Sequence, residues 1–187
     1  GQWNARAAFA AKTFAGTLSV TTDGQLVYNL PASSAALSKG TQVDLLAPQT
    51  GGRRSALDSV RPILLTESFV SVTGAPIAAT PQGYRPAESK VNYFVGDDTR
   101  KHQANLNTYD RVNLGDVFPG VNVQLRATGS NVEKIFTVAP QRDPSQINVK
   151  LDGATSLAIG AQGELVAQTA DGPVSYTAPI AFQESAD

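Results

Sequence analysis

TYDRVNLGDVFPGVNVQLRATGSNVEKIFTVAPQRDP, residues 108–144, decides the fold that the sequence predicts. Apolar and polar residues alternate through 121–125 and, with one step out of phase at Ile135, through 132–138, which is typical of half-buried β-strands. The residues Thr128-Gly129-Ser130 between them favour a turn. The sequence therefore predicts a β-hairpin at the centre of an antiparallel sheet.

Turn chemistry and side-chain alternation set the details of this hairpin. Pro119-Gly120, just before it, suits a type II turn, because Pro presets φ at the second position and Gly accepts the positive φ of the third. Alternation places one set of side chains on each strand toward the core, with Lys134 at an edge or reaching solvent. These two sets are Val121, Val123 and Leu125, and Val132, Lys134, Phe136 and Val138. We expect Phe136 to lie in the main core.

The rest of the chain repeats the pattern of short strands and Gly-containing turns. Asp23-Gly24 joins the strand-like segments 17–21 and 26–30 in a second hairpin, and 6–14 reads as a strand although its alanines also favour a helix. Further strands are expected at 63–65, 68–72, 91–95, 146–151, 156–159, 164–168, 174–176 and 180–183. The sequence thus predicts an all-β fold with little helix, either an antiparallel β-sandwich or a partly open barrel.

Composition shifts suggest how the chain is divided. We expect a single β-rich module over 1–187, with subdomains at 1–75 and 91–187 joined by a connector at 75–90 that carries three prolines and little regular structure. Residues 31–62 have little periodic apolar content and should form an irregular, mobile insertion, apart from a short strand around 42–46. A polar loop is expected at 99–107.

Charge and residue usage exclude several classes of function. Fifteen Lys and Arg balance sixteen Asp and Glu, which gives no electrostatic basis for binding nucleic acid. No apolar run approaches the roughly 18 to 20 residues that a membrane-spanning helix needs, so we expect no membrane insertion. The chain has no Cys and therefore no disulfide framework or thiol nucleophile. Because it also has no Met, we expect it to be a piece of a longer protein and to have other domains of that polypeptide as partners.

Several phrases of the sequence resemble, in order, a bacterial domain of unknown function that occurs near the N-termini of large exported proteins, often ahead of SBBP repeats (predicted β-propellers). The phrases are VNYFVGDD (91–98), TY (108–109), DVFPGVNV (116–123), Glu133, FTVAP (136–140) and DPSQI (143–147), with weaker matches at GQW (1–3) and at both 163–165 and 179–183. The resemblance implies an extracellular or cell-surface location in a bacterium and a modular context. It implies no catalytic residue, and it weakens at His102, Asn107, Lys134-Ile135 and 31–62.

Candidate catalytic groups are few, and we expect no catalytic residue and no enzyme activity. His102 is the only histidine, so a zinc site of the HExxH type is excluded, and no Gly-x-Ser-x-Gly motif accompanies it. We therefore interpret His102 as an exposed loop residue. Glu133, on the second strand of the central hairpin, is expected to pair across the sheet, either with Arg126 or with the neighbours of Lys134 on the adjacent strand.

Calcium is the one cofactor that the sequence leaves open. Asp97, Asp98 and Asp116, together with Asp110, could supply the oxygen ligands that Ca²⁺ prefers, although their spacing matches no EF-hand loop and favours solvated turns. The aromatics Trp3, Tyr84 and Tyr109 could stack on sugar rings, although packing within the protein is favoured.

Together these features favour a non-enzymatic extracellular module, structural or adhesive, within a larger bacterial surface or secreted protein. The alternative is a carbohydrate-binding or carbohydrate-processing domain, either with or without calcium. The first needs only a stable β framework with exposed contact surfaces, whereas the second needs a concave site with convergent aromatic and carboxylate groups. Surface glycans or other proteins are therefore the expected external partners.

Overall fold

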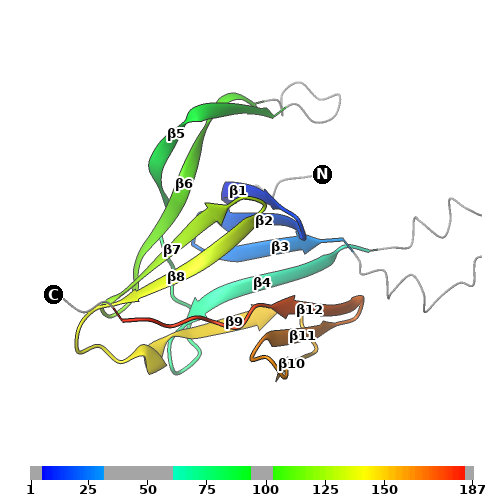
Figure 1. The fold of residues 1–187 in the computed structure, drawn as a ribbon, viewed down its shortest axis with the longest axis vertical. Helices are drawn as coiled ribbons and strands as arrows, with labels where there is room; N and C mark the ends of the chain where they lie inside the picture. The colour runs from blue at the N-terminus through cyan, green and yellow to red at the C-terminus, as the bar shows by residue number, and fades with distance from the viewer. Residues whose placement is uncertain (1–5, 32–60, 94–102, 184–187) are drawn as a thin grey trace, which may run out of the picture. The chain divides into compact units, whose positions relative to one another are not determined.

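The computed structural model describes residues 6–31, 61–93 and 103–183 (Figure 1). These residues form twelve strands and one short 3-10 turn, and the expected all-β, antiparallel fold is confirmed. The strands are β1 (Ala7–Thr13), β2 (Gly16–Thr21), β3 (Leu26–Leu30), β4 (Ile63–Val70), β5 (Gln82–Tyr93), β6 (Gln103–Phe118), β7 (Val121–Thr128), β8 (Asn131–Val138), β9 (Asn148–Asp152), β10 (Ser156–Ile159), β11 (Leu165–Thr169) and β12 (Gly172–Tyr176). No helix in the described part of the chain is long and apolar enough to cross a membrane.

The strands form three sheets. Their strand orders are β1-β2-β3-β4-β9, β5-β6-β7-β8 and β10-β11-β12. The chain clusters into two compact units, unit 1 with Gly1–Tyr28 and Thr66–Leu151, and unit 2 with Asn29–Leu65 and Asp152–Asp187. The expected subdomains, 1–75 and 91–187, follow different boundaries, and that division stays a prediction.

The core of unit 1 lies between two of the sheets. Buried side chains from β2, β3 and β4 pack with buried side chains from β6 and β7, so the two sheets face each other as the layers of a sandwich. The cluster consists of Leu18, Val20, Leu26, Phe69, Ala79, Leu114, Val117, Phe118, Val121, Val123 and Leu125. Burial of these apolar groups is the main favourable contribution to the stability of the unit.

The central hairpin forms as expected. Val121 on β7 pairs with Val138 on β8, and the register continues without a shift to Thr128 and Asn131. Gly120 has φ of +72° in the turn before the hairpin, as a type II turn requires. The predicted inward set of β7 is buried, whereas Phe136 is only partly buried and packs against the core cluster.

The first hairpins are also confirmed. Residues 7–13 form a strand rather than a helix, and this strand pairs with β2 in antiparallel register from Ala7 and Thr21 to Thr13 and Gly16. Asp23-Gly24 lies in the turn between β2 and β3, where Gly24 has φ of +85°. Strong β-pairing with the next segment therefore overrides the helix propensity of the alanines.

The Pro-rich stretch 75–90 has more regular structure than its composition predicts. Residues 82–93 form β5, which includes Pro86, and β5 is an edge strand of its sheet. Proline lacks an N–H but is tolerated at sheet edges and irregularities, and the pairing of β5 with β6 shifts register between Pro86 and Lys90. The expectation of little regular structure is wrong for these residues.

Other boundaries also differ from the expected ones. β6 begins at Gln103, so the expected loop ends before residues 103–107, which pair with β5 despite their polar composition. The two segments expected at 63–65 and 68–72 form the single strand β4. β9 begins at Asn148 after the 3-10 turn η2 (Pro144–Gln146).

The strand expected at 180–183 does not form. The chain has no strand between Tyr176 and the end of the described region at residue 183. Ile180 and Phe182 in this segment are 88% and 82% exposed, so neither supplies the buried apolar contact that stabilises a strand. The short strand expected around 42–46 lies outside the described residues.

Candidate functional site

A carboxylate occupies a core-facing position of β4. Alternate residues of this strand are buried, and these are Ile63, Leu65, Glu67 and Phe69. Glu67 is 4% exposed, and its Oε1 accepts a hydrogen bond of 3.0 Å from the hydroxyl of Tyr28. Buried charges are rare in proteins unless they are paired, so the surroundings of Glu67 must supply a cation.

Lys134 supplies that cation from the facing sheet. It lies on β8 opposite Leu125, which is 4% exposed, and so it points toward the core with the other inward residues of its strand. Its Nζ contacts Oε2 of Glu67. The Lys134 side chain keeps 22% of its surface exposed. The expectation that it would lie at an edge or reach solvent missed this partner.

Tyr28, Glu67 and Lys134 therefore form one polar group in an apolar layer, which we call the core ionic cluster. All three lie in unit 1 and come from β3, β4 and β8. Each oxygen of the Glu67 carboxylate has its own donor, one from the phenol and one from the ammonium. Removing two charges from water costs several kcal/mol per ion, and contacts of this kind offset that cost only when the geometry is good.

A second ion pair lies on the same hairpin but in a different environment. Arg126 on β7 is the cross-strand neighbour of Glu133 on β8, and its Nε donates a hydrogen bond of 3.0 Å to Oε2 of Glu133. The expected pairing of these residues is confirmed. Their side chains are 43% and 42% exposed, so water screens the interaction and it contributes little to stability.

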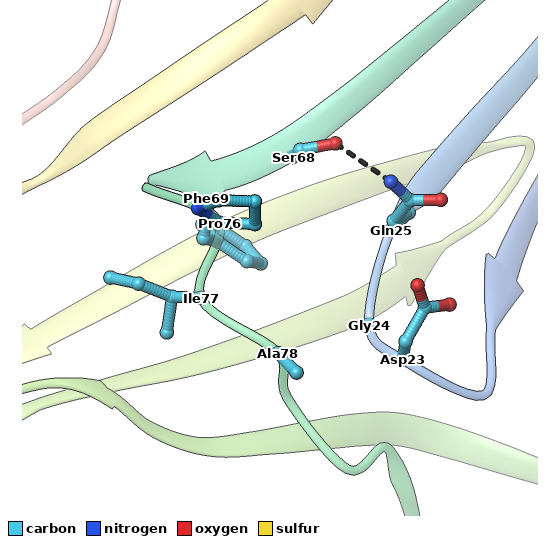
Figure 2. Close-up of a pocket in the computed structure, with 8 residues that line it drawn as sticks. All are labelled: Asp23, Gly24, Gln25, Ser68, Phe69, Pro76, Ile77 and Ala78. Carbon is cyan, nitrogen blue, oxygen red and sulfur yellow. Dashed lines mark hydrogen bonds between the residues drawn. The ribbon is translucent and has the colours of Figure 1, made fainter. Parts of the chain in front are cut away.

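A small pocket lies beside the turn between β2 and β3 (Figure 2). It has a volume of about 70 Å³ and is lined by Asp23, Gly24, Gln25, Ser68, Phe69, Pro76, Ile77 and Ala78. Nε2 of Gln25 donates a hydrogen bond of 3.0 Å to Oγ of Ser68, and Oδ1 of Asp23 is buried without a hydrogen-bond partner. A pocket of this size accommodates a few water molecules, one of which could satisfy Asp23, but not a sugar ring.

Of the three calcium candidates, Asp116 lies in the part of the chain that the structure describes. Asp116 is exposed on β6 and accepts a hydrogen bond of 3.1 Å from Nδ2 of Asn122. Asp97, Asp98 and His102 lie outside the described residues. Among the residues in 6–31, 61–93 and 103–183, no group of three or more His, Cys, Asp or Glu could hold a metal ion. Calcium binding stays a prediction.

The candidate aromatics have different environments. Tyr109 packs edge to face on Phe9, with ring centroids 5.7 Å apart, so it serves packing. Tyr84 on β5 is 51% exposed, with the Arg85 guanidinium 5.8 Å from its ring centroid. Trp3 lies outside the described residues. Of the two described members of this set, Tyr84 is therefore the one that a partner could reach more easily.

Sequence reasoning missed Glu67 as a site residue. The signal was its position in the alternation Ile63, Leu65, Glu67, Phe69, which places a carboxylate where the strand otherwise turns apolar side chains inward. Together with Lys134 at an inward position of β8, this alternation predicts a buried pair once the two strands are known to face each other.

A family model described as a domain of unknown function (DUF7948) matches residues 1–187. No curated protein and no solved structure matches the chain.

Proposed function

The chain belongs to this family of domains of unknown function over residues 1–187, so we propose its function from the features of its own surface. The chain is a non-enzymatic structural or adhesive module of a larger bacterial protein, on the cell surface or secreted. The observation that carries the proposal is a two-stranded extension of the sheet β5-β6-β7-β8 in unit 1.

This extension, which we call the arm, consists of residues 86–93 of β5 and 103–110 of β6. β7 pairs with β6 only from Arg111 to Phe118, so among the described strands the outer part of β6 has β5 as its only partner. Figure 1 shows the β5–β6 hairpin continuing beyond the end of β7. Tyr109, at the base of the arm, packs on Phe9 of β1. An isolated two-stranded ribbon is only marginally stable in water, so the part of the arm beyond Tyr109 would gain stability from a partner.

The arm offers contact groups of the kind that protein partners use. Residues 104–107 are all exposed, and Leu106 among them is 37% exposed. Tyr84 and Arg85 lie on β5 at the base of the arm, and both residue types are enriched in protein interfaces. Strand edges also bind extended segments of other chains by backbone hydrogen bonding. These features support contact with other domains of the same polypeptide or with other proteins.

The extracellular location rests on the resemblance of the sequence to domains of exported bacterial proteins. It can be tested with antibodies raised against the purified 187-residue chain, applied to intact and to permeabilised source cells. The proposal predicts labelling of intact cells, or antigen in the culture medium. Labelling that requires permeabilisation and leaves the medium free of antigen would contradict it.

The contact role of the arm can be tested in cells that display the parent protein. Leu106→Lys and Tyr84→Ala should reduce attachment between cells or to a surface, whereas Val72→Lys, at a position that is 79% exposed in the turn after β4, should not. Equal attachment by all three variants would exclude the arm as the contact surface. A glycan array with and without Ca²⁺ distinguishes the alternative, because calcium-dependent glycan binding favours a carbohydrate-binding domain.

A further inference from the structure

The core ionic cluster places an amine beside a carboxyl group within the packed layers of unit 1. We propose that Lys134 and Glu67 condense to an amide, an isopeptide bond that joins β8 to β4 across the core. This inference rests on the contacts of the cluster and is independent of the proposed function. It assigns a covalent bond to two side chains that otherwise form an ion pair.

The first requirement of such a reaction is that the two groups are held together. Nζ of Lys134 contacts Oε2 of Glu67, and both residues lie on strands that are paired in sheets, β4 between β3 and β9 and β8 beside β7. Two residues further along each strand, Phe69 and Phe136 pack edge to face with ring centroids 6.5 Å apart. Well-oriented groups in one molecule react as though at effective concentrations of roughly 10⁵ to 10⁸ M. The packed strands therefore supply the orientation that free lysine and glutamate lack.

The second requirement is a driving force. Glu67 is 4% exposed, so its charge is held away from water among apolar neighbours. Condensation removes both charges and leaves a neutral amide, which is cheaper to bury than an ion pair. The exposed 22% of the Lys134 side chain marks a route by which the released water reaches solvent.

The step balances without any further reactant. Transfer of one proton from the Lys134 ammonium to Oε2 of Glu67 gives a neutral amine and a carboxylic acid. Nζ then attacks Cδ of Glu67, the Nζ–Cδ bond forms, and the Cδ–Oε2 bond breaks. Oε2 leaves as water with two of the three ammonium protons, and Nζ keeps the third. A carboxylate and an ammonium are thus converted into an amide and one water molecule.

Tyr28 has a defined part in this step. Its hydroxyl donates a hydrogen bond to Oε1, the oxygen that stays on Cδ and becomes the amide carbonyl. Negative charge develops on that oxygen in the tetrahedral intermediate, and a donor already in place stabilises it. Tyr28 is therefore the donor that stabilises the oxyanion.

Mass spectrometry of the intact, purified chain tests the proposal directly. The linked chain is lighter than its sequence by one water molecule, including under fully denaturing conditions. Trypsin should then fail to cut after Lys134 and should release residues 55–90 joined to residues 127–142, because Arg61 and Arg85 precede prolines and resist cleavage. A chain of full sequence mass, cut by trypsin after Lys134, would overturn the proposal whatever any variant shows.

Variants assign the chemistry to the named residues. Lys134→Arg keeps the positive charge but should restore the full sequence mass, and so should Glu67→Ala. Glu133→Gln is the matched control, since it changes the adjacent carboxylate in the exposed pair with Arg126 and should leave the linkage intact. Loss of the linkage in this control, or its persistence in Lys134→Arg, would contradict the assignment.

The role of Tyr28 is tested by the rate of linkage after cell-free synthesis. Tyr28→Phe should link about 100-fold more slowly than the parent, the order of effect seen when one oxyanion donor is removed. Linkage at the parental rate would exclude Tyr28 from the step.

Discussion

Phe69 on β4 and Phe136 on β8 meet edge to face across the core of unit 1, with their ring planes at 84°. Each lies two residues beyond a member of the buried ion pair, Phe69 beyond Glu67 and Phe136 beyond Lys134. Because side chains alternate along strands, the aromatic pair and the ion pair lie on the same two facing surfaces. The contact of Glu67 with Lys134 is therefore part of the packing of the two sheets.

The aromatic pair leads to a first prediction about stability. Phe69 is 2% exposed, so Phe69→Ala should reduce the free energy of unfolding by about 3 to 5 kcal/mol through lost burial and a cavity. Phe136 is only partly buried, and Phe136→Ala should cost less, about 2 kcal/mol. Urea denaturation of both variants beside the parent measures the difference. A Phe136 variant less stable than the Phe69 variant would show that the core is centred on β8.

A second prediction concerns the charges in the core. Lys134→Met keeps the length of the side chain but leaves the Glu67 carboxylate buried without its cation, which should cost about 3 to 5 kcal/mol. Glu133→Gln, in the exposed pair with Arg126, should cost about 0.5 kcal/mol or less. Both are measured by urea denaturation. Similar losses for the two variants would mean that Glu67 is solvated in solution.

Two glycines with similar backbone angles provide a third prediction. Gly24 and Gly74 have φ of +85° and +81°, so alanine is strained at either position, by roughly 1 to 2 kcal/mol. A Cβ at Gly24 would also lie 2.6 Å from Cβ of Ala79, whereas a Cβ at Gly74 would meet nothing within 4 Å. Thermal unfolding should therefore show a larger loss of stability for Gly24→Ala than for Gly74→Ala. Equal losses would show that Ala79 does not pack on this turn.

The fourth prediction concerns pH. The Ser145 hydroxyl and the Ser145 backbone N–H both donate to the Asp143 carboxylate, at 2.7 and 2.8 Å, and they lower the pKa of Asp143 below its ordinary value of 3.8. A lowered pKa in the folded state means that this carboxylate stabilises the fold above its unfolded pKa and loses that contribution as pH falls through the folded pKa. Ser145→Ala should raise the pKa of Asp143 toward 3.8, as measured by NMR titration of its carboxyl carbon. An unchanged pKa of Asp143 would contradict the hydrogen bonds from Ser145 to its carboxylate.

Local patterns sufficed to predict the strands whose signals are short-range. The hairpin of β7 and β8 combines alternation on both strands with Pro119-Gly120 before it and Gly129 in its turn, and every one of these features acts within a few residues. The pairing of Arg126 with Glu133 follows from the same register. Strands of this kind can be predicted because the turn sets the register and the register sets the contacts.

The parts that escaped prediction depend on tertiary context. Pro86 argues against a strand from composition, yet it is accommodated because β5 lies at the edge of its sheet. Residues 104–107 look like a polar loop because their side chains are exposed. The contact between Glu67 and Lys134 joins residues 67 positions apart, and no local pattern specifies which inward side chains of two facing sheets will meet.

The central claim is that Glu67 and Lys134 meet between the two sheets of unit 1. A crystal structure of the chain, with electron density defined around both side chains, tests it most directly. We predict that Glu67 points inward beside Tyr28 and that the density is continuous from Nζ of Lys134 to Cδ of Glu67. Separate side chains that both extend into solvent would contradict the contact, and with it the account of how this core is built.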